Sequence, residues 1–206
     1  MNRNLYYVFT AISFALLVAA PGRFAYGIII CFELFFLVLS GFLFSFLLKK
    51  LMLHEMNSIV TVLGLIFSTV LYKQIIMAMY PLIALQMSFV FYLPAVSSYM
   101  IGIIYKNIDV STKVSVIDNL KVTGYFSVLA LIFYAVRDIF GYGTFTLPSS
   151  NGLYEKVFFD KDTISWGTFF ASIPGALVLV CIAILVFIYV QNKFKIIKRI
   201  EDSNAA

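Results

Sequence analysis

The feature that most constrains this chain is a series of six long apolar runs separated by short polar segments. Between Asn57 and Tyr105, the only charged side chain is Lys73. A helix needs about 20 mostly apolar residues to cross the hydrocarbon core of a bilayer, and each run approaches that length. The composition, 62% hydrophobic and 12% charged, is also typical of membrane proteins. We therefore predict an all-α, polytopic membrane protein.

Six transmembrane helices are predicted within a single membrane domain, residues 1–206. Their ranges are Leu5–Ala20, Phe24–Leu48, Ser58–Met79, Leu82–Tyr105, Gly124–Phe140 and Trp166–Gln191. The first run is expected to be an uncleaved span and not a signal peptide, because a second span follows it at once. It is also short, with about 16 residues against the roughly 20 that a span needs.

The fourth predicted span contains Pro94, followed by Ser97 and Ser98. Proline removes a backbone donor and clashes with the preceding turn, so we expect this helix to break near the middle of the membrane. Spans one and four hold equivalent places in two three-span halves, residues 1–80 and 81–206. Paired short or broken helices at such places favour an inverted repeat around a central site.

The basic residues predict the orientation of the chain. If both termini are cytoplasmic, ten Lys and Arg side chains lie on the inner side and four on the outer side. The four outer residues are Arg23, Arg137, Lys156 and Lys161. The sequence thus predicts a bacterial inner-membrane protein with both termini in the cytoplasm. The net charge of +5 is interpreted as this orientation signal, and no nucleic-acid partner is predicted.

Two ionisable residues inside predicted spans are candidates for charge coupling or helix pairing, Glu33 and Lys73. A carboxylate inside a bilayer is costly unless it is paired or protonated, so its presence suggests a functional site. The alternative for Glu33 is a structural role, in which it reaches the outer interface or binds a neighbouring helix. Lys73 either pairs with Glu33 or extends its amine outward.

A second candidate pair, Arg137 and Asp138, ends the fifth span just before Gly141-Tyr142-Gly143. We expect these two residues to shape the outer end of that helix, and the glycines to turn the chain. A potassium filter would need Thr-Val before the Gly-Tyr-Gly sequence, where this chain has Ile139-Phe140.

The first span also carries a candidate helix-packing stripe, Ala11, Ala15 and Ala19. Small residues at this spacing let helices approach closely, either within the chain or against another membrane subunit. No catalytic residue or metal site is predicted. The chain has a single histidine, His54, and its two cysteines, Cys31 and Cys181, have no CxxC partner.

Short motifs occur in a fixed order along the C-terminal half. They are Ser115-Val116-Ile117-Asp118, Gly124-Tyr125, Arg137-Asp138 before Gly141-Tyr142-Gly143, Asn151-Gly152-Leu153 and Ile173-Pro174-Gly175-Ala176, with Asn57-Ser58 as a weaker match in the third span. In this order they resemble the Rnf/Nqr family of small six-span membrane subunits. The resemblance implies an inverted three-plus-three repeat and a homologous six-span partner of opposite orientation. It also implies a place in sodium- or proton-translocating complexes that move electrons between NADH and quinone, or between ferredoxin and NAD.

Members of that family bind a shared 2Fe–2S cluster through one cysteine in each broken helix, in spans one and four. The corresponding stretches here, Ala11-Ile12-Ser13 and Phe89-Val90-Phe91, contain no cysteine. Thiolates hold such clusters, so no cofactor is predicted in this chain. The resemblance therefore favours a membrane subunit of, or a divergent relative within, such a complex. At most the chain is a subunit of a redox-driven, ion-translocating oxidoreductase, with no self-contained active site.

Two alternatives stay open on the sequence. The first is the substrate-binding membrane subunit of an energy-coupling-factor-type uptake transporter, which also has six spans and docks its partner through an alanine stripe. The second is a non-catalytic membrane scaffold in which every charge is structural. Neighbouring genes for flavoprotein and ferredoxin-like subunits would favour the redox complex, whereas neighbouring genes for ATPase subunits would favour the transporter.

Overall fold

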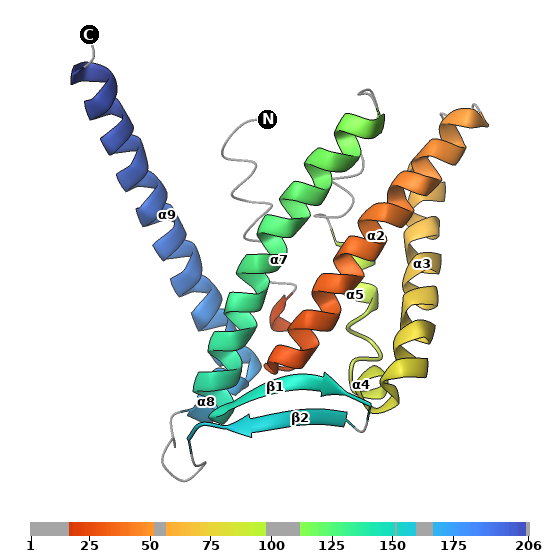
Figure 1. The fold of residues 1–206 in the computed structure, drawn as a ribbon, viewed down its shortest axis with the longest axis horizontal. Coiled ribbons are helices and arrows are strands. Elements are labelled where there is room, and N and C mark those ends of the chain that lie inside the picture. The colour runs from red at the N-terminus through yellow and green to blue at the C-terminus, as the bar shows by residue number, and fades with distance from the viewer. Residues whose placement is uncertain (1–16, 52–56, 98–111, 151, 160–166, 205–206) are drawn as a thin grey trace.

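The computed structural model describes residues 17–51, 57–97, 112–150, 152–159 and 167–204. Its elements are α2 (Phe24–Lys50), α3 (Asn57–Met79), α4 (Pro81–Gln86), α5 (Tyr92–Val96), α7 (Thr112–Tyr142), β1 (Thr144–Ser149), β2 (Gly152–Val157), α8 (Gly167–Ala171) and α9 (Ile173–Asn204). The long helices extend from one end of the molecule, where the β1–β2 hairpin lies across the start of α2 and the end of α7 (Figure 1). We call this the hairpin end, and the opposite one the far end.

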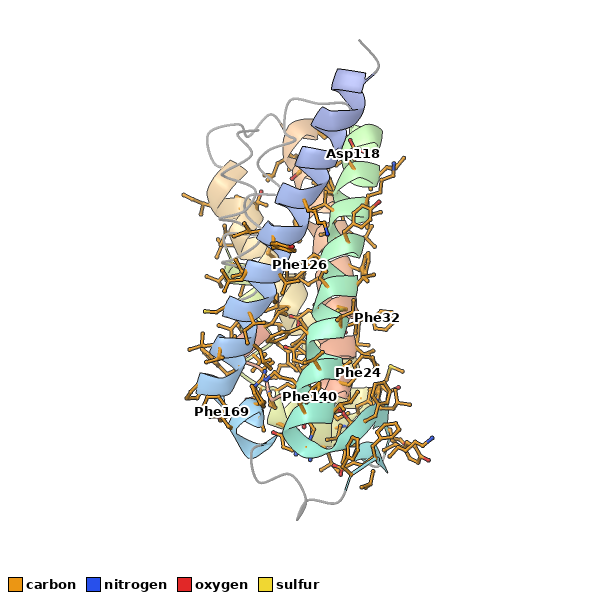
Figure 2. The ribbon with its side chains drawn as sticks, turned by 90° about the vertical axis from the view of Figure 1, so that its left-hand side faces the viewer. Phe24, Phe32, Asp118, Phe126, Phe140 and Phe169 are labelled. Atoms are coloured by element: carbon orange, nitrogen blue, oxygen red, sulfur yellow. The ribbon has the colours of Figure 1, made fainter. Side chains whose placement is uncertain are left out.

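Three of the described helices are long and apolar enough to cross a membrane. They cover Phe24–Leu48 in α2, Ile59–Met79 in α3 and Val116–Tyr142 in α7. Helix α2 packs against both α3 and α7. Buried residues such as Leu37, Leu65 and Ala130 form the core between them. The opposite helix faces expose large apolar side chains, including Phe32, which projects away from the helices (Figure 2). Exposed apolar surface of this extent is suited to lipid.

These helices match three of the predicted spans. Helices α2 and α3 agree with the second and third spans at both ends, and α7 covers the fifth but begins twelve residues earlier, at Thr112 (124 − 112). The first span falls almost wholly outside the described residues. The sixth is divided at Ser172 into α8 and α9, and its apolar stretch, Ile173–Val186, is shorter than a full span. The total of six spans and the inverted repeat thus stay predictions.

The fourth predicted span is interrupted, and its helix also ends directly after the proline: α5 stops at Val96, and Ser97 is extended with φ −67° and ψ 142°. A first break precedes the proline, because α4 ends at Gln86 and α5 begins at Tyr92. Pro94 itself occupies the first turn of α5, where a backbone N–H has no partner within the helix and its loss costs little. The first break therefore comes from the turns that precede the proline, in which Val90 N donates to Met87 O at 2.8 Å.

The described residues are mostly helical, as the all-α prediction expects, and the hairpin adds one two-stranded sheet to them. Strands β1 and β2 pair in antiparallel register from Thr144 opposite Val157 to Ser149 opposite Gly152. Gly143 ends α7 with a φ of +67°, the left-handed conformation that commonly closes a helix. Its N–H still donates to Ile139 O at 3.0 Å, so the strand leaves directly from the last helical turn.

Candidate functional site

Polar residues gather at the hairpin end, where α2 begins and α7 meets β1. We call Arg23, Arg137, Asp138, Thr144 and Thr146 the hairpin-end cluster. All but Arg23 are buried, with exposures of 1% or less. Buried charges are tolerated only when their hydrogen-bonding capacity is met, so the partners of each side chain decide what this cluster does.

Asp138 is the acceptor at the centre of the cluster. Its Oδ2 accepts from Phe24 N at 3.1 Å, from Thr146 N at 2.8 Å and from Thr146 Oγ1 at 2.7 Å. Its Oδ1 accepts from Thr144 Oγ1 at 3.0 Å. Both oxygens are therefore occupied by donors of the chain itself. A carboxylate held in this way positions backbone and is not free to act as a general base.

These bonds complete the N-terminus of α2. The first turn of this helix has no acidic residue, and its first N–H groups lack intrahelical acceptors. Asp138 accepts from Phe24 N, and Thr146 Oγ1 accepts from Ala25 N at 3.3 Å. A negative charge at a helix N-terminus is also favoured by the helix dipole. The cap of α2 thus comes from residues more than 110 positions away in the chain.

Arg137 joins two other segments to α7 through their carbonyl oxygens. Its guanidinium donates from Nη1 to Ala20 O at 2.9 Å and from Nη2 to Ala171 O at 3.2 Å. Ala171 is the last residue of α8, where carbonyls need external donors. A Cβ on Gly22 would lie 2.9 Å from Arg137 Nε, so the glycine leaves the space that the side chain fills.

Arg23 lies at the edge of the cluster and connects it to the hairpin surface. Its Nη1 donates to Thr144 Oγ1 at 3.0 Å and is 3.1 Å from Glu155 Oε1. The guanidinium carbon also lies 4.0 Å from the centre of the Tyr142 ring. Because Arg23 and Glu155 are partly exposed, we expect this ion pair to contribute less than the buried bonds of Asp138.

The two candidates inside the spans lie apart from this cluster. Glu33 is fully buried in α2, and neither carboxyl oxygen has a hydrogen-bond partner among the described residues. Lys73 forms no ion pair within the described part of the chain. Its Nζ is 3.5 Å from Ser88 O and 5.5 Å from the centre of the Tyr92 ring, in the α4–α5 segment. Lys73 therefore contacts the α4–α5 segment and makes no ion pair with Glu33 in the described part of the chain.

The remaining sequence candidates are placed only in part. Ala11 and Ala15 lie outside the described residues, whereas Ala19 is described and exposed. Both cysteines are free; Cys31 is buried and Cys181 is exposed. The alanine stripe thus stays a prediction.

Sequence reasoning missed Thr144 and Thr146, which supply three of the side-chain bonds around Asp138 and Arg23. The available signal was that Thr144 and Thr146 are two residues apart and follow Gly143 directly, because alternate residues of a strand share one face.

No known protein-family model, curated protein or solved structure matches the chain.

Proposed function

We propose that this chain is an integral membrane subunit of, or a divergent relative within, an Rnf/Nqr-type ion-translocating electron-transport complex. In this proposal it spans the bacterial inner membrane with both termini in the cytoplasm and the hairpin end outside. It acts as a scaffold that holds other membrane subunits, including a homologous partner of opposite orientation. Electrons then travel through redox groups carried by those partners.

The observation that carries the proposal is the hairpin-end cluster. Arg137, Asp138 and Gly143 belong to the most distinctive of the motifs that resemble the family, and all three have defined structural roles here. Asp138 caps α2, Arg137 fixes Ala20 and Ala171, and Gly143 starts the hairpin. A chance match in an exposed loop would not need buried partners for both charges. The motif therefore helps to hold the folded structure of this chain together, as we expect if the chain keeps the scaffold of that family.

The distribution of basic residues along the helices supports the proposed orientation. Lys50 ends α2 at the far end of the bundle, where α7 also begins and α9 ends (Figure 1). Most Lys and Arg residues of the chain belong to these far-end segments or to α9, whereas Arg23, Arg137 and Lys156 lie at the hairpin end. Cytoplasmic segments carry the excess of basic residues, so the far end is assigned to the cytoplasm.

The experiment is to solubilise membranes gently, capture the full-length chain and identify the subunits that remain bound. Iron, labile sulfide and the electron paramagnetic resonance spectrum after reduction are measured on the same sample. We expect flavoprotein or ferredoxin-like subunits to co-purify with the chain. Asp138→Asn should weaken retention of these partners, and Lys121→Gln, an exposed charge of the same helix outside the motifs, is the control.

ATPase subunits in place of redox subunits would overturn the proposal in favour of an uptake transporter. A chain that purifies without any other subunit would favour a stand-alone scaffold. An iron–sulfur cluster whose resonance signal is lost on replacing Cys31 or Cys181 would show that this chain supplies redox ligands. That result would overturn the part of the proposal in which only the partners carry redox groups.

A further inference from the structure

Glu33 is a buried acid placed deep within a spanning helix. It follows Phe24 by nine residues (33 − 24), which at 1.5 Å per residue is about 14 Å along α2. The hydrocarbon core of a bilayer is about 30 Å thick, so Glu33 lies near its middle. Its side chain has no exposed surface, and its Oε1 and Oε2 atoms lack hydrogen-bond partners among the described residues.

The contacts between α2 and α7 give the orientation of Glu33 relative to α7. Cys31 Sγ donates to Ser127 O at 3.6 Å. Three residues of α7 nearer the far end, which is less than one turn, Phe35 lies 4.0 Å from the position that a Cβ on Gly124 would take. Glu33 is two residues from both Cys31 and Phe35, so at 3.6 residues per turn its side chain lies on the face of α2 opposite to the one that contacts α7.

Two hydroxyl groups at this depth are also without partners. Ser127 Oγ and Thr123 Oγ1 are buried, and neither forms a hydrogen bond with the described residues. Serine and threonine inside a helix commonly bond to a carbonyl one turn earlier, as Thr69 Oγ1 does with Leu65 O at 3.1 Å. These hydroxyls belong to the helix that Glu33 faces away from, so they do not supply the partners that its carboxyl lacks.

The charged and titratable groups on the elements packed against α2 are engaged elsewhere. On α3, Tyr72 donates to Ile29 O at 2.8 Å, and Lys73 is directed at Ser88 O, near Tyr92 of α5. On α7, Tyr134 donates to Leu17 O at 3.0 Å, and Arg137 and Asp138 belong to the hairpin-end cluster. Strand β1 carries no titratable side chain. No cation of the described residues therefore neutralises Glu33.

We propose that Glu33 is a proton-binding site within the bilayer. A bare carboxylate in this position would lose its hydration without gaining a partner, and a bound proton removes that cost. A single carboxyl group can hold a proton by itself, whereas a metal cation needs several further oxygen ligands. The site is independent of whether the chain belongs to a redox complex, although in such a complex it would hold a coupling proton.

Infrared difference spectroscopy of the full chain in lipid tests the site directly. A protonated carboxyl has a C=O stretching band that a carboxylate lacks. We expect this band in the unaltered chain at a pH where exposed carboxyls are ionised. Glu33→Gln should abolish it, and Glu155→Gln, at the surface of the hairpin, should leave it in place.

A second readout uses a hydrophobic carbodiimide, which adds to a protonated carboxyl and leaves a stable N-acylurea detectable by mass spectrometry. Labelling of Glu33 should fall as the pH is raised and should not respond to Na⁺ at fixed pH. Loss of the band or label on adding Na⁺ would replace the proton site with a sodium site. Absence of any Glu33-dependent band would overturn the proposal, even if redox subunits still co-purify with the chain.

Discussion

Replacing Asp138 with alanine tests whether a residue at the end of α7 caps α2. The substitution removes the acceptor of two backbone donors, Phe24 N, which is partly buried, and Thr146 N, which is buried, at 3.1 and 2.8 Å. A buried donor left without a partner costs about 1–3 kcal/mol in the free energy of unfolding, and the partly buried donor adds a smaller loss because water can reach it. The hydroxyls of Thr144 and Thr146 can rotate to other acceptors, so they are left out of this sum.

Asp138→Asn should be milder than Asp138→Ala. The amide keeps one oxygen for the donors around Oδ2 but loses the charge that interacts with the dipole of α2. We expect a loss of about 1–2 kcal/mol, the upper part of the range for a charge at a helix end. The matched control is Asp118→Ala, an exposed acid of the same helix at its far end (Figure 2). Its effect should stay within about 0.5 kcal/mol.

The assay is reversible unfolding in mixed detergent micelles, followed by circular dichroism. Hydrogen exchange measured by mass spectrometry adds a local readout, because the amides of Phe24 and Thr146 should exchange faster in Asp138→Ala. The cap would be refuted if Asp138→Ala were no more destabilising than Asp118→Ala. Equal losses for Asp138→Ala and Asp138→Asn would show that charge, and not the geometry of the acceptors, is what matters.

Four further predictions use the same unfolding assay. Gly27→Ala should destabilise the chain by about 1–3 kcal/mol, because a Cβ would lie 2.5 Å from the Tyr134 ring. Gly124→Ala should instead stabilise α7 by up to about 1 kcal/mol, since the nearest side-chain atom is 4.0 Å away; destabilisation there would contradict the α2–α7 packing. Lys73→Met should change stability by no more than about 0.5 kcal/mol, and a larger loss would indicate a buried role. Glu155→Gln should cost less than about 1 kcal/mol, and its effect should shrink as salt is added.

The spanning helices were predictable because their apolar runs are long and their ends are marked. In α2 the run begins directly after Arg23 and ends at Lys49-Lys50, and the structure follows those limits. Such boundaries depend only on local composition and length. The break before Pro94 was harder to locate, because the turns at Met87–Phe91 have no glycine, proline or polar cluster of their own apart from Ser88.

The hairpin and its cluster depend on contacts that local patterns do not specify. The Asn151-Gly152 pair is a strong turn signal, but it was considered only as part of a family motif, and no strand was predicted between the fifth and sixth spans. Arg137 and Asp138 could be identified as unusual because they are charged residues at a span end. Their partners could not be identified, because Ala20, Phe24 and Ala171 contribute only backbone atoms, which have no signature in the sequence.

The remote capping of α2 has a consequence for biogenesis. The first N–H groups of this helix are satisfied by residues that leave the ribosome more than a hundred positions later. Until then the hairpin-end terminus of α2 is uncapped, and water or the insertion machinery must supply acceptors for those donors. A nascent chain that stops before Thr146 should leave this end of α2 accessible to protease, even with three helices inserted. Completion of the hairpin therefore marks the point at which the first half of the chain becomes fixed in its final arrangement.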